Sequence, residues 1–271
     1  MSGPPPSGSP VALCLGGMDP SAGAGLLRDV MTLAALGVQP MAICAAETIQ
    51  NGAACLAIQP PADPLPRLEA LAPHLAGPWG VKLGLCALEP AALTTLANRL
   101  TALGPAARIW DPILAPTAGV GLHTADRLRA MAGLLLGTGD WVVCPNRPEA
   151  AALAGDGPEA AAGAPPETLA GPLLDLGAAA VWLKGGHGQG DEVEDFWITR
   201  GSVVSLGRAR RLPGDRRGTG CTLASAWLAF RLRGLDGPAA AREAASFLRT
   251  RWNSAHQPGG FGRPCFAPGA P

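Results

Sequence analysis

Short apolar segments alternate along this chain with longer segments in which apolar residues recur every three or four positions. The short segments are typical of buried strands, and the longer ones of helices with one apolar face. The predicted strands are Val11–Leu15, Met41–Ala46, Val81–Leu85, Arg108–Trp110, Trp141–Cys144 and Ala179–Leu183. The predicted helices are Gly25–Leu36, Leu65–Leu75, Pro90–Leu103, Arg127–Leu136, Pro148–Ala154, Thr168–Leu176, Cys221–Arg233 and Pro238–Ala255. This alternation predicts a three-layer α/β fold, a mainly parallel central sheet with helices on both faces.

Two further apolar segments, Asp195–Thr199 and Ser202–Leu206, are separated by only two residues. So short a connection favours an antiparallel hairpin that extends the sheet. The ends of the chain lack the alternating pattern, so we expect a disordered segment over 1–10 and a loosely packed tail over 256–271. No convincing linker interrupts residues 11–255, which are predicted to form a single domain.

Composition narrows the classes of function. The 271 residues are 48% hydrophobic, and 21 Lys and Arg residues balance 21 Asp and Glu residues. A balanced charge lacks the long-range positive field that a nucleic-acid partner requires, and no apolar run approaches the ~18 residues of a membrane span. We therefore expect a protein that acts on small molecules and has neither a nucleic-acid nor a membrane partner.

The seven cysteines are scattered through apolar segments and include no C-x-x-C pair that would indicate zinc or a redox couple. We interpret them as reduced thiols. The first residues show neither the basic region nor the apolar stretch of a signal peptide. These observations predict a cytoplasmic protein.

The stretch Gly218, Thr219, Gly220 and Cys221 precedes a small and apolar run that is long enough for a helix. Glycines let the backbone turn tightly, and the first N–H groups of a helix have no partner within it. The first three residues therefore predict an anion hole for a transferring phosphoryl group, and the helix terminus also favours thiolate at the cysteine. The alternative is an ordinary junction between loop and helix, with a cysteine in the core.

Ligands of a parallel sheet bind beyond the carboxyl ends of its strands, so the residues there are candidates for chemistry. A glycine-rich loop with Gly17, Asp19 and Gly23 follows the first strand. We interpret it as a substrate-binding loop; the alternative is that Asp19 only caps the next helix. Gln50 and Asn51 follow the second strand and either pair with a heterocycle or form a polar turn.

Two later strand ends carry polar side chains that suit a nucleotide. Asn146 and Glu149 stand at a predicted helix start, where they would organise hydrated Mg²⁺, an ion that keeps most of its water ligands. Glu149 alternatively serves only the helix dipole. Lys184 ends the strand Ala179–Leu183, and its charge would meet a nucleotide phosphate unless it is merely solvated.

Taken in order, these pieces resemble the ribokinase-like superfamily, and within it the hydroxymethylpyrimidine/phosphomethylpyrimidine kinases of thiamine biosynthesis. The motifs that carry the resemblance are Gly17–Gly25, Asp29, Ala35–Gly37, Gln50–Asn51, Val81–Gly84, Asp111–Pro112, Pro145–Glu149, Lys184–His187 and Gly218–Leu223. The resemblance implies a ribokinase-like fold, a homodimer, and ATP and Mg²⁺ as cofactors. It also implies two phosphate transfers, first to 4-amino-5-hydroxymethyl-2-methylpyrimidine and then to its monophosphate.

The resemblance implies roles for individual residues. Gly17, Asp19, Gly23 and Gln50 would bind the pyrimidine substrate, Asn146 and Lys184 the nucleotide, and Glu149 the Mg²⁺ ion, mostly through water. Cys221 would be the base that deprotonates or orients the substrate hydroxyl. Because a free thiol with a pKa of about 8.5 is mostly protonated at neutral pH, it needs nearby cations, and Arg216 and Arg217 lie immediately upstream.

The chain departs from the family pattern at three places. Ala22 replaces a glycine that is usual in the first loop, Arg217 stands where a histidine often precedes the anion hole, and residues 116–119 lack the usual lysine and serine. The missing lysine would weaken the second phosphorylation. Two alternatives stay open: a pyridoxal or related vitamin B6 kinase, and a non-catalytic pyrimidine-binding protein of the same fold.

Overall fold

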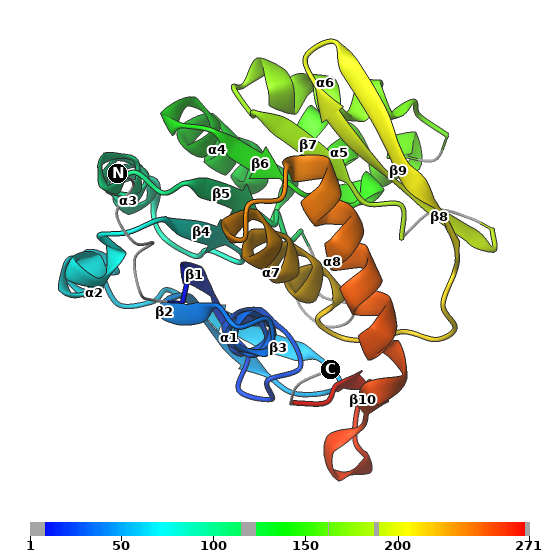
Figure 1. Cartoon of the computed structure of the whole chain (residues 1–271), viewed down its shortest axis with the longest axis horizontal. Helices are drawn as coiled ribbons and strands as arrows, with labels where there is room; N and C mark the ends of the chain where they lie inside the picture. The colour runs from blue at the N-terminus through cyan, green and yellow to red at the C-terminus, as the bar shows by residue number, and fades with distance from the viewer. Residues whose placement is uncertain (1–8, 115–122, 162, 187–189, 269–271) are drawn as a thin grey trace, which may run out of the picture.

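The computed structural model describes residues 9–114, 123–161, 163–186 and 190–268. Its centre is a nine-stranded sheet with the strand order β3-β2-β1-β4-β5-β6-β7-β8-β9 (Figure 1). The strands are β1 (Val11–Met18), β2 (Gln39–Gln50), β3 (Cys55–Gln59), β4 (Trp79–Leu83), β5 (Ala107–Trp110), β6 (Trp141–Val143), β7 (Ala180–Leu183), β8 (Glu192–Thr199) and β9 (Ser202–Arg210). Strands β2 to β7 in this order are parallel, whereas β3, β8 and β9 are antiparallel additions at the edges.

Helices cover both faces of the sheet (Figure 1). One face carries α1 (Gly25–Ala35), α7 (Thr219–Leu232) and α8 (Gly237–Arg251), and the other carries α2 (Leu65–Leu71), α3 (Pro90–Leu103), α4 (Ala125–Leu135), α5 (Arg147–Ala154) and α6 (Pro166–Asp175). The alternation of side chains along β1 explains both layers, since Ala12 and Cys14 belong to the first core and Leu13 and Leu15 to the second. The predicted three-layer α/β fold and its edge hairpin are confirmed.

The second strand is longer than its apolar pattern predicts. It runs to Gln50 because β3 pairs with residues 47–50 in antiparallel register. None of residues 47–50 is buried, and Ile49 is half exposed, so the sequence shows no buried strand there. Gln50 therefore lies at the end of a strand, whereas Asn51 forms the predicted polar turn, in which its Oδ1 accepts from the N–H groups of Ala53 and Ala54.

The C-terminal segment corrects a prediction. We expected a loosely packed tail over 256–271, but Cys265 and Phe266 are buried and form β11, which pairs with β10 (Ala255–His256). The hairpin of β10, β11 and the residues between them is called the C-terminal hairpin below. The sequence pattern did not predict this hairpin, because its surroundings are rich in glycine and proline and only two apolar residues, Cys265 and Phe266, anchor it. Residues 1–8 of the predicted disordered segment lie outside the described residues.

None of the described helices is both long and apolar enough to cross a bilayer.

Candidate functional site

A cavity of about 1140 Å³ opens at the carboxyl ends of the parallel strands. Ligand pockets usually measure about 300–1,000 Å³, so this one has room for a nucleotide together with a small heterocycle. Of the predicted site residues, those that line it are Gly17, Asp19, Gln50, Asn146, Glu149, Lys184, Gly218, Thr219, Gly220 and Cys221. Only Gly23 is absent from the lining among them. The structure therefore brings the separate motifs together at one place.

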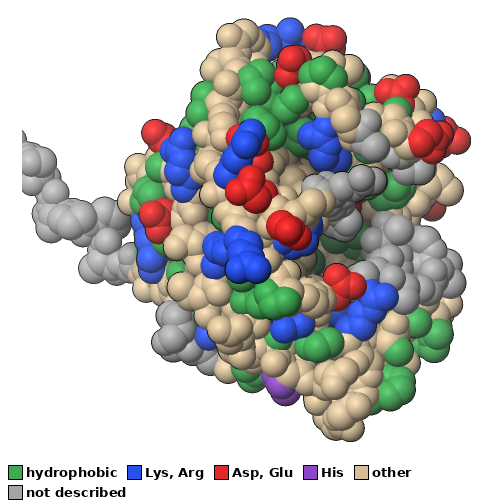
Figure 2. All heavy atoms as spheres, turned by 90° about the vertical axis from the view of Figure 1, so that its right-hand side faces the viewer, with side chains coloured by type: hydrophobic (Ala, Val, Ile, Leu, Met, Phe, Trp, Pro, Cys, Tyr) green, Lys and Arg blue, Asp and Glu red, His purple; other side chains and the backbone are tan. Residues whose placement is uncertain are grey.

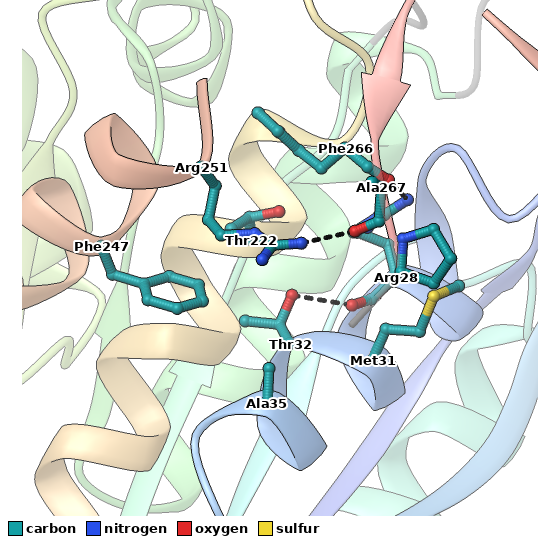
Figure 3. Close-up of a pocket in the computed structure, with 10 residues that line it drawn as sticks. Arg28, Met31, Thr32, Ala35, Thr222, Phe247, Arg251, Phe266 and Ala267 are labelled. Carbon is teal, nitrogen blue, oxygen red and sulfur yellow. Dashed lines mark hydrogen bonds between the residues drawn. The ribbon is translucent and has the colours of Figure 1, made fainter. Parts of the chain in front are cut away.

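A second cavity lies where α1, α7 and α8 meet the end of the C-terminal hairpin (Figure 3). Its volume is about 20 Å³, and Arg28, Thr222 and Phe266 are among the residues around it. A water molecule needs about 10–15 Å³ by this kind of measure, so the space takes one water and no organic substrate. The large cavity is therefore the candidate active site.

The residues of the predicted anion hole form the cap and first turn of α7, which begins at Thr219, two residues before the predicted start. Gly218 caps the helix with φ 79°, in the left-handed region that favours glycine. A Cβ at this position would lie 2.4 Å from the carbonyl oxygen of Gly23. The first intrahelical bond runs from the N–H of Thr222 to the carbonyl of Gly218, 2.8 Å, so the helix supplies no acceptor for the three N–H groups before it.

The thiol of Cys221 is neutral in this environment. Burial raises its pKa to about 12, and the charge of Lys82 opposes this rise only in part. The expected help from Arg216 and Arg217 is wrong, because both guanidinium groups are engaged elsewhere. Arg216 stacks over the ring of Trp252, 5.2 Å from its centroid, and Arg217 binds the first loop.

A buried ion pair acts on the thiol of Cys221. Both of its residues belong to the motifs of the family resemblance, which did not show that they pair. Lys82 Nζ is 2.6 Å from Asp29 Oδ1, and the hydroxyl of Ser225 donates to the same oxygen at 2.9 Å. Burial lowers the pKa of Lys82, but the charge of Asp29 overcomes this and raises it overall, so the lysine stays charged. A lysine inside an otherwise apolar strand was the sequence signal for this pair.

A second buried pair lies beside the first turn of α7. Lys184 Nζ is 2.8 Å from Asp111 Oδ1, and a Cβ on Gly220 would lie 3.3 Å from the other oxygen of Asp111. Burial alone would raise the pKa of Asp111, but Lys184 and then Lys82 lower it, so the carboxylate is ionised. Asp111 is a site residue to which the sequence analysis gave no role, although its place directly after a strand was the available signal.

Asn146 and Glu149 form a capping box at the start of α5. The side chain of Asn146 accepts from the N–H of Glu149 at 2.9 Å, and Glu149 Oε2 accepts from the N–H of Asn146 at 2.8 Å. Burial raises the pKa of Glu149 to about 7, against the pull of Lys184. Both residues thus stabilise the start of α5, as the alternative interpretation predicted for Glu149. Both also line the cavity.

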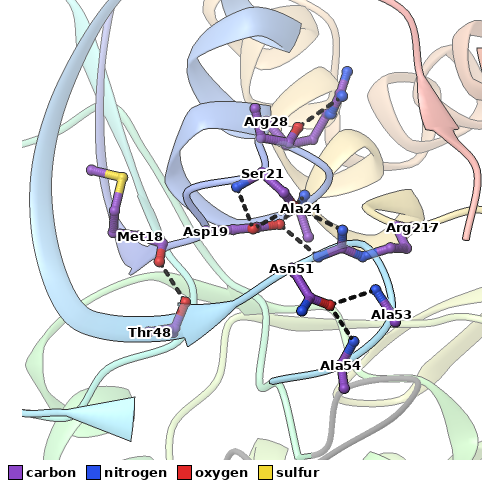
Figure 4. A network of polar contacts seen from close by, with 11 residues as sticks. Met18, Asp19, Ser21, Ala24, Arg28, Thr48, Asn51, Ala53, Ala54 and Arg217 are labelled. Atoms are coloured by element: carbon purple, nitrogen blue, oxygen red, sulfur yellow. Dashed lines mark hydrogen bonds and ion pairs between the residues drawn. The ribbon is translucent and has the colours of Figure 1, made fainter. Parts of the chain in front are cut away.

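The first loop is held by Asp19 (Figure 4). Its carboxylate accepts from the N–H of Ser21 and from the N–H of Ala24, each at 2.9 Å, so Asp19 satisfies backbone donors of the loop, whereas α1 itself has no side-chain cap. Ala22, which replaces the usual glycine, adopts φ 55° and strains the backbone there. A contact between Asp19 and a substrate stays a prediction.

Arginines are a further feature of the cavity that the motifs did not single out. Those that line it are Arg208, Arg211, Arg216, Arg217, Arg242, Arg249 and Arg263. Acidic side chains lie among them, and Figure 2 shows basic and acidic groups mixed on one face of the molecule. A lining with this many guanidinium groups suits an anionic ligand such as a nucleotide.

Residues 19–265 match the family described as phosphomethylpyrimidine kinase. The chain belongs to this family. The predicted enzyme class, a phosphotransferase, is confirmed.

Curated relatives cover nearly the whole chain. The hydroxymethylpyrimidine/phosphomethylpyrimidine kinase of Rhizobium meliloti (strain 1021) is 31% identical over 90% of this chain and 91% of its own length. The enzyme of the same name from Escherichia coli (strain K12) is 29% identical over 88% of each chain. The resemblance stated from the motifs is therefore confirmed.

Solved structures agree on the fold. The pyridoxal kinase from Staphylococcus aureus, in complex with AMP-PCP and pyridoxal, superposes with a TM-score of 0.79 at 22% identity, covering 97% of this chain and 95% of the other. The phosphomethylpyrimidine kinase from Clostridium difficile 630 gives 0.71 at 22% identity, covering 89% of this chain and 99% of the other.

Proposed function

We propose that this phosphomethylpyrimidine kinase family member transfers phosphate from ATP to 4-amino-5-hydroxymethyl-2-methylpyrimidine and then to the monophosphate, as part of thiamine biosynthesis. The observation that carries the proposal is the position of the anion hole. The first turn of α7 lies in one cavity with the charged end of β7 and with the first loop. The names of relatives at about the same length and 29–32% identity support the choice of substrate.

The chemistry follows from which residues meet at the anion hole. An acceptor hydroxyl beside Cys221 attacks the γ-phosphorus in line, so an O–P bond to the acceptor forms while the bond to the β-phosphate oxygen breaks and ADP leaves. The first N–H groups of α7, for which the helix has no acceptor, and the ammonium of Lys184 stabilise the charge on the migrating group. A thiol with a pKa of about 12 already carries its proton and cannot accept another, so we assign Cys221 the orientation of the hydroxyl, whose own proton passes to an oxygen of the transferred phosphoryl group.

The carboxylates of the site fit Mg²⁺ in the form in which kinases use it. Among the described residues no cluster of three or more acidic, His or Cys side chains could enclose a metal ion by itself. Asp111 and Glu149 instead offer a few oxygens, which suits an ion that keeps waters and binds mainly nucleotide phosphates. When bound, Mg²⁺ neutralises charge on the phosphate oxygens. These two residues would hold it, Glu149 through water.

Further predictions belong to the same proposal. The family resemblance implies pyrimidine binding by Gly17, Asp19, Gly23 and Gln50; Gly17, Asp19 and Gln50 line the cavity, which supports this for them, whereas Gly23 does not line it. A homodimer and a cytoplasmic location follow from the family resemblance and the reduced cysteines. The missing lysine of residues 116–119 lies outside the described residues, so its effect on the second phosphorylation also stays a prediction.

The purified protein with ATP, Mg²⁺ and the hydroxymethylpyrimidine tests the proposal when the products are weighed by mass spectrometry. We expect the monophosphate and then the diphosphate, with one ADP for each phosphate transferred. Pyridoxal is the parallel substrate because a pyridoxal kinase shares this fold. Faster phosphorylation of pyridoxal would replace the proposed substrate, and no substrate-dependent ADP with either compound would favour the non-catalytic binder.

A further inference from the structure

Arg217 joins the two halves of the proposed active site. Its Nη2 donates to Asp19 Oδ2 at 2.7 Å and its Nη1 donates to the hydroxyl of Ser21 at 2.8 Å (Figure 4). Only 10% of its side chain is exposed. Its backbone is covalently next to Gly218, the cap of α7. One residue thus connects the first loop to the anion hole.

The other bonds of Asp19 are local. They reach the N–H and hydroxyl of Ser21 and the N–H of Ala24, and they fix the shape of the loop. They do not fix its distance from α7. The ion pair with Arg217 does, because a charge-assisted hydrogen bond at a buried site is strong and directional.

The loop is adapted to this arginine at Gly23, the one predicted site residue that does not line the cavity. A Cβ on Gly23 would lie 2.6 Å from Arg217 Nη1. That distance is shorter than any normal contact, so a side chain at this position would push the guanidinium away. Gly23 therefore serves Arg217 and need not touch a substrate.

The C-terminal hairpin holds the backbone of Arg217 from the other side. The N–H of Arg217 donates to the carbonyl of Pro264 at 2.9 Å, and the N–H of Arg263 donates to the carbonyl of Gly52 at 2.8 Å. Gly52 belongs to the turn between β2 and β3, two residues after Gln50. Arg217 therefore stands in a continuous set of contacts from the first loop, through the hairpin, to the strand end that carries Gln50.

We infer that Arg217 is a positioning residue that sets the distance between the bound acceptor and the anion hole. The inference rests on the proposed function, since it assumes that the first loop binds the acceptor. Phosphoryl transfer needs reacting atoms about 3–3.5 Å apart, and a displacement of about 1 Å can cost 10²-fold in rate. An enzyme whose first loop is released from Arg217 should still bind ATP at β7 and α7, but its loop holds the acceptor poorly.

The test compares Arg217→Ala with the wild type in steady-state kinetics in which each substrate is varied in turn. We expect kcat/KM for the hydroxymethylpyrimidine to fall about 10²-fold while KM for MgATP changes less than about two-fold. Arg217→Lys keeps the charge and one of the two bonds, so it should recover part of the loss. Arg99→Ala is the matched control, because it removes an exposed arginine–carboxylate pair, with Glu69, that lies away from the cavity.

Gly23→Ala provides an independent variant. It should reproduce the acceptor defect, and the double variant Gly23→Ala/Arg217→Ala should be no worse than Arg217→Ala alone, because both act through the same contact. The inference would be overturned by additive losses of kcat/KM in the double variant. It would also be overturned if Arg217→Ala left the acceptor KM and kcat unchanged, or if it raised KM equally for both substrates. If Arg217→Ala does not fold, the same comparison is made with Arg217→Lys and Arg217→His. An activity of these variants that follows only their folded fraction would also overturn the inference. A wild type that phosphorylates no pyrimidine overturns the proposed function instead.

Discussion

At the scale of single residues, Cys221 shows how burial changes an expectation drawn from a motif. A helix terminus favours thiolate, but the desolvation of a thiol that is 5% exposed outweighs it. In the proposed mechanism the thiol orients the acceptor and not the nucleotide, so Cys221→Ala should lower kcat at least ~10-fold and leave the Kd of MgATP within about two-fold. Cys221→Ser, which keeps a hydroxyl donor and acceptor, should lose less. Turnover of Cys221→Ala near that of the wild type, measured by ADP release, would rule out this role.

Glu149 gives a prediction about pH. Its pKa of about 7 is above its ordinary value of 4.5, so the folded protein binds the proton more tightly than the unfolded chain does. The stability from this group is complete below about pH 4.5 and is lost as the pH rises through 7. Glu149→Gln keeps the acceptor oxygen for the N–H of Asn146 but stays neutral, so it should gain up to ~3 kcal/mol over the wild type between pH 5 and pH 8. Urea titrations at both pH values measure this gain, and an equal difference at both would contradict it.

At the scale of elements, the pair Lys82–Asp29 links β4 to α1, and Ser225 extends the link to α7. Lys82→Met would leave a buried carboxylate without its cation, so we expect a loss of about 3–5 kcal/mol in the free energy of unfolding. Adding Asp29→Leu removes that carboxylate, and the double variant should regain much of the loss. Chemical denaturation of the three proteins measures both effects. A double variant less stable than Lys82→Met would show that the charges are not the reason for the loss.

Sequence patterns predict elements well where burial is complete, as in β1, β4 and β6, whose residues are almost all buried. They fail at β3 and the C-terminal hairpin, where pairing between distant segments decides the structure and the apolar signal is two or three residues long. The same contrast holds in the site. Motifs located Gly218–Cys221 and Lys184, which line the cavity, but the ion pairs of Asp29, Lys82 and Asp111 depend on partners far away in the chain.

At the scale of the whole molecule, the C-terminal hairpin is anchored by Phe266, which is 2% exposed. Its carbonyl accepts from Arg28 Nη2 at 2.7 Å, and its ring lies 6.1 Å from that of Trp252. Phe266→Ala should cost about 3–5 kcal/mol, and it should weaken acceptor binding more than ATP binding because the hairpin holds Arg217. Thermal unfolding and isothermal titration with each substrate check the two parts. Equal weakening of both substrates would separate the hairpin from acceptor binding.

The hairpin also orders events during synthesis. The sheet and the anion-hole helix are encoded before residue 233, whereas the contacts to Gly52 and Arg217 come from residues 263 and 264. On the ribosome, a chain whose sheet and α7 have already folded still lacks the contacts of residues 263 and 264, which support the proposed pyrimidine side of the cavity. These contacts form only when this later stretch emerges. Competence to receive the acceptor therefore arises later in synthesis than assembly of the sheet.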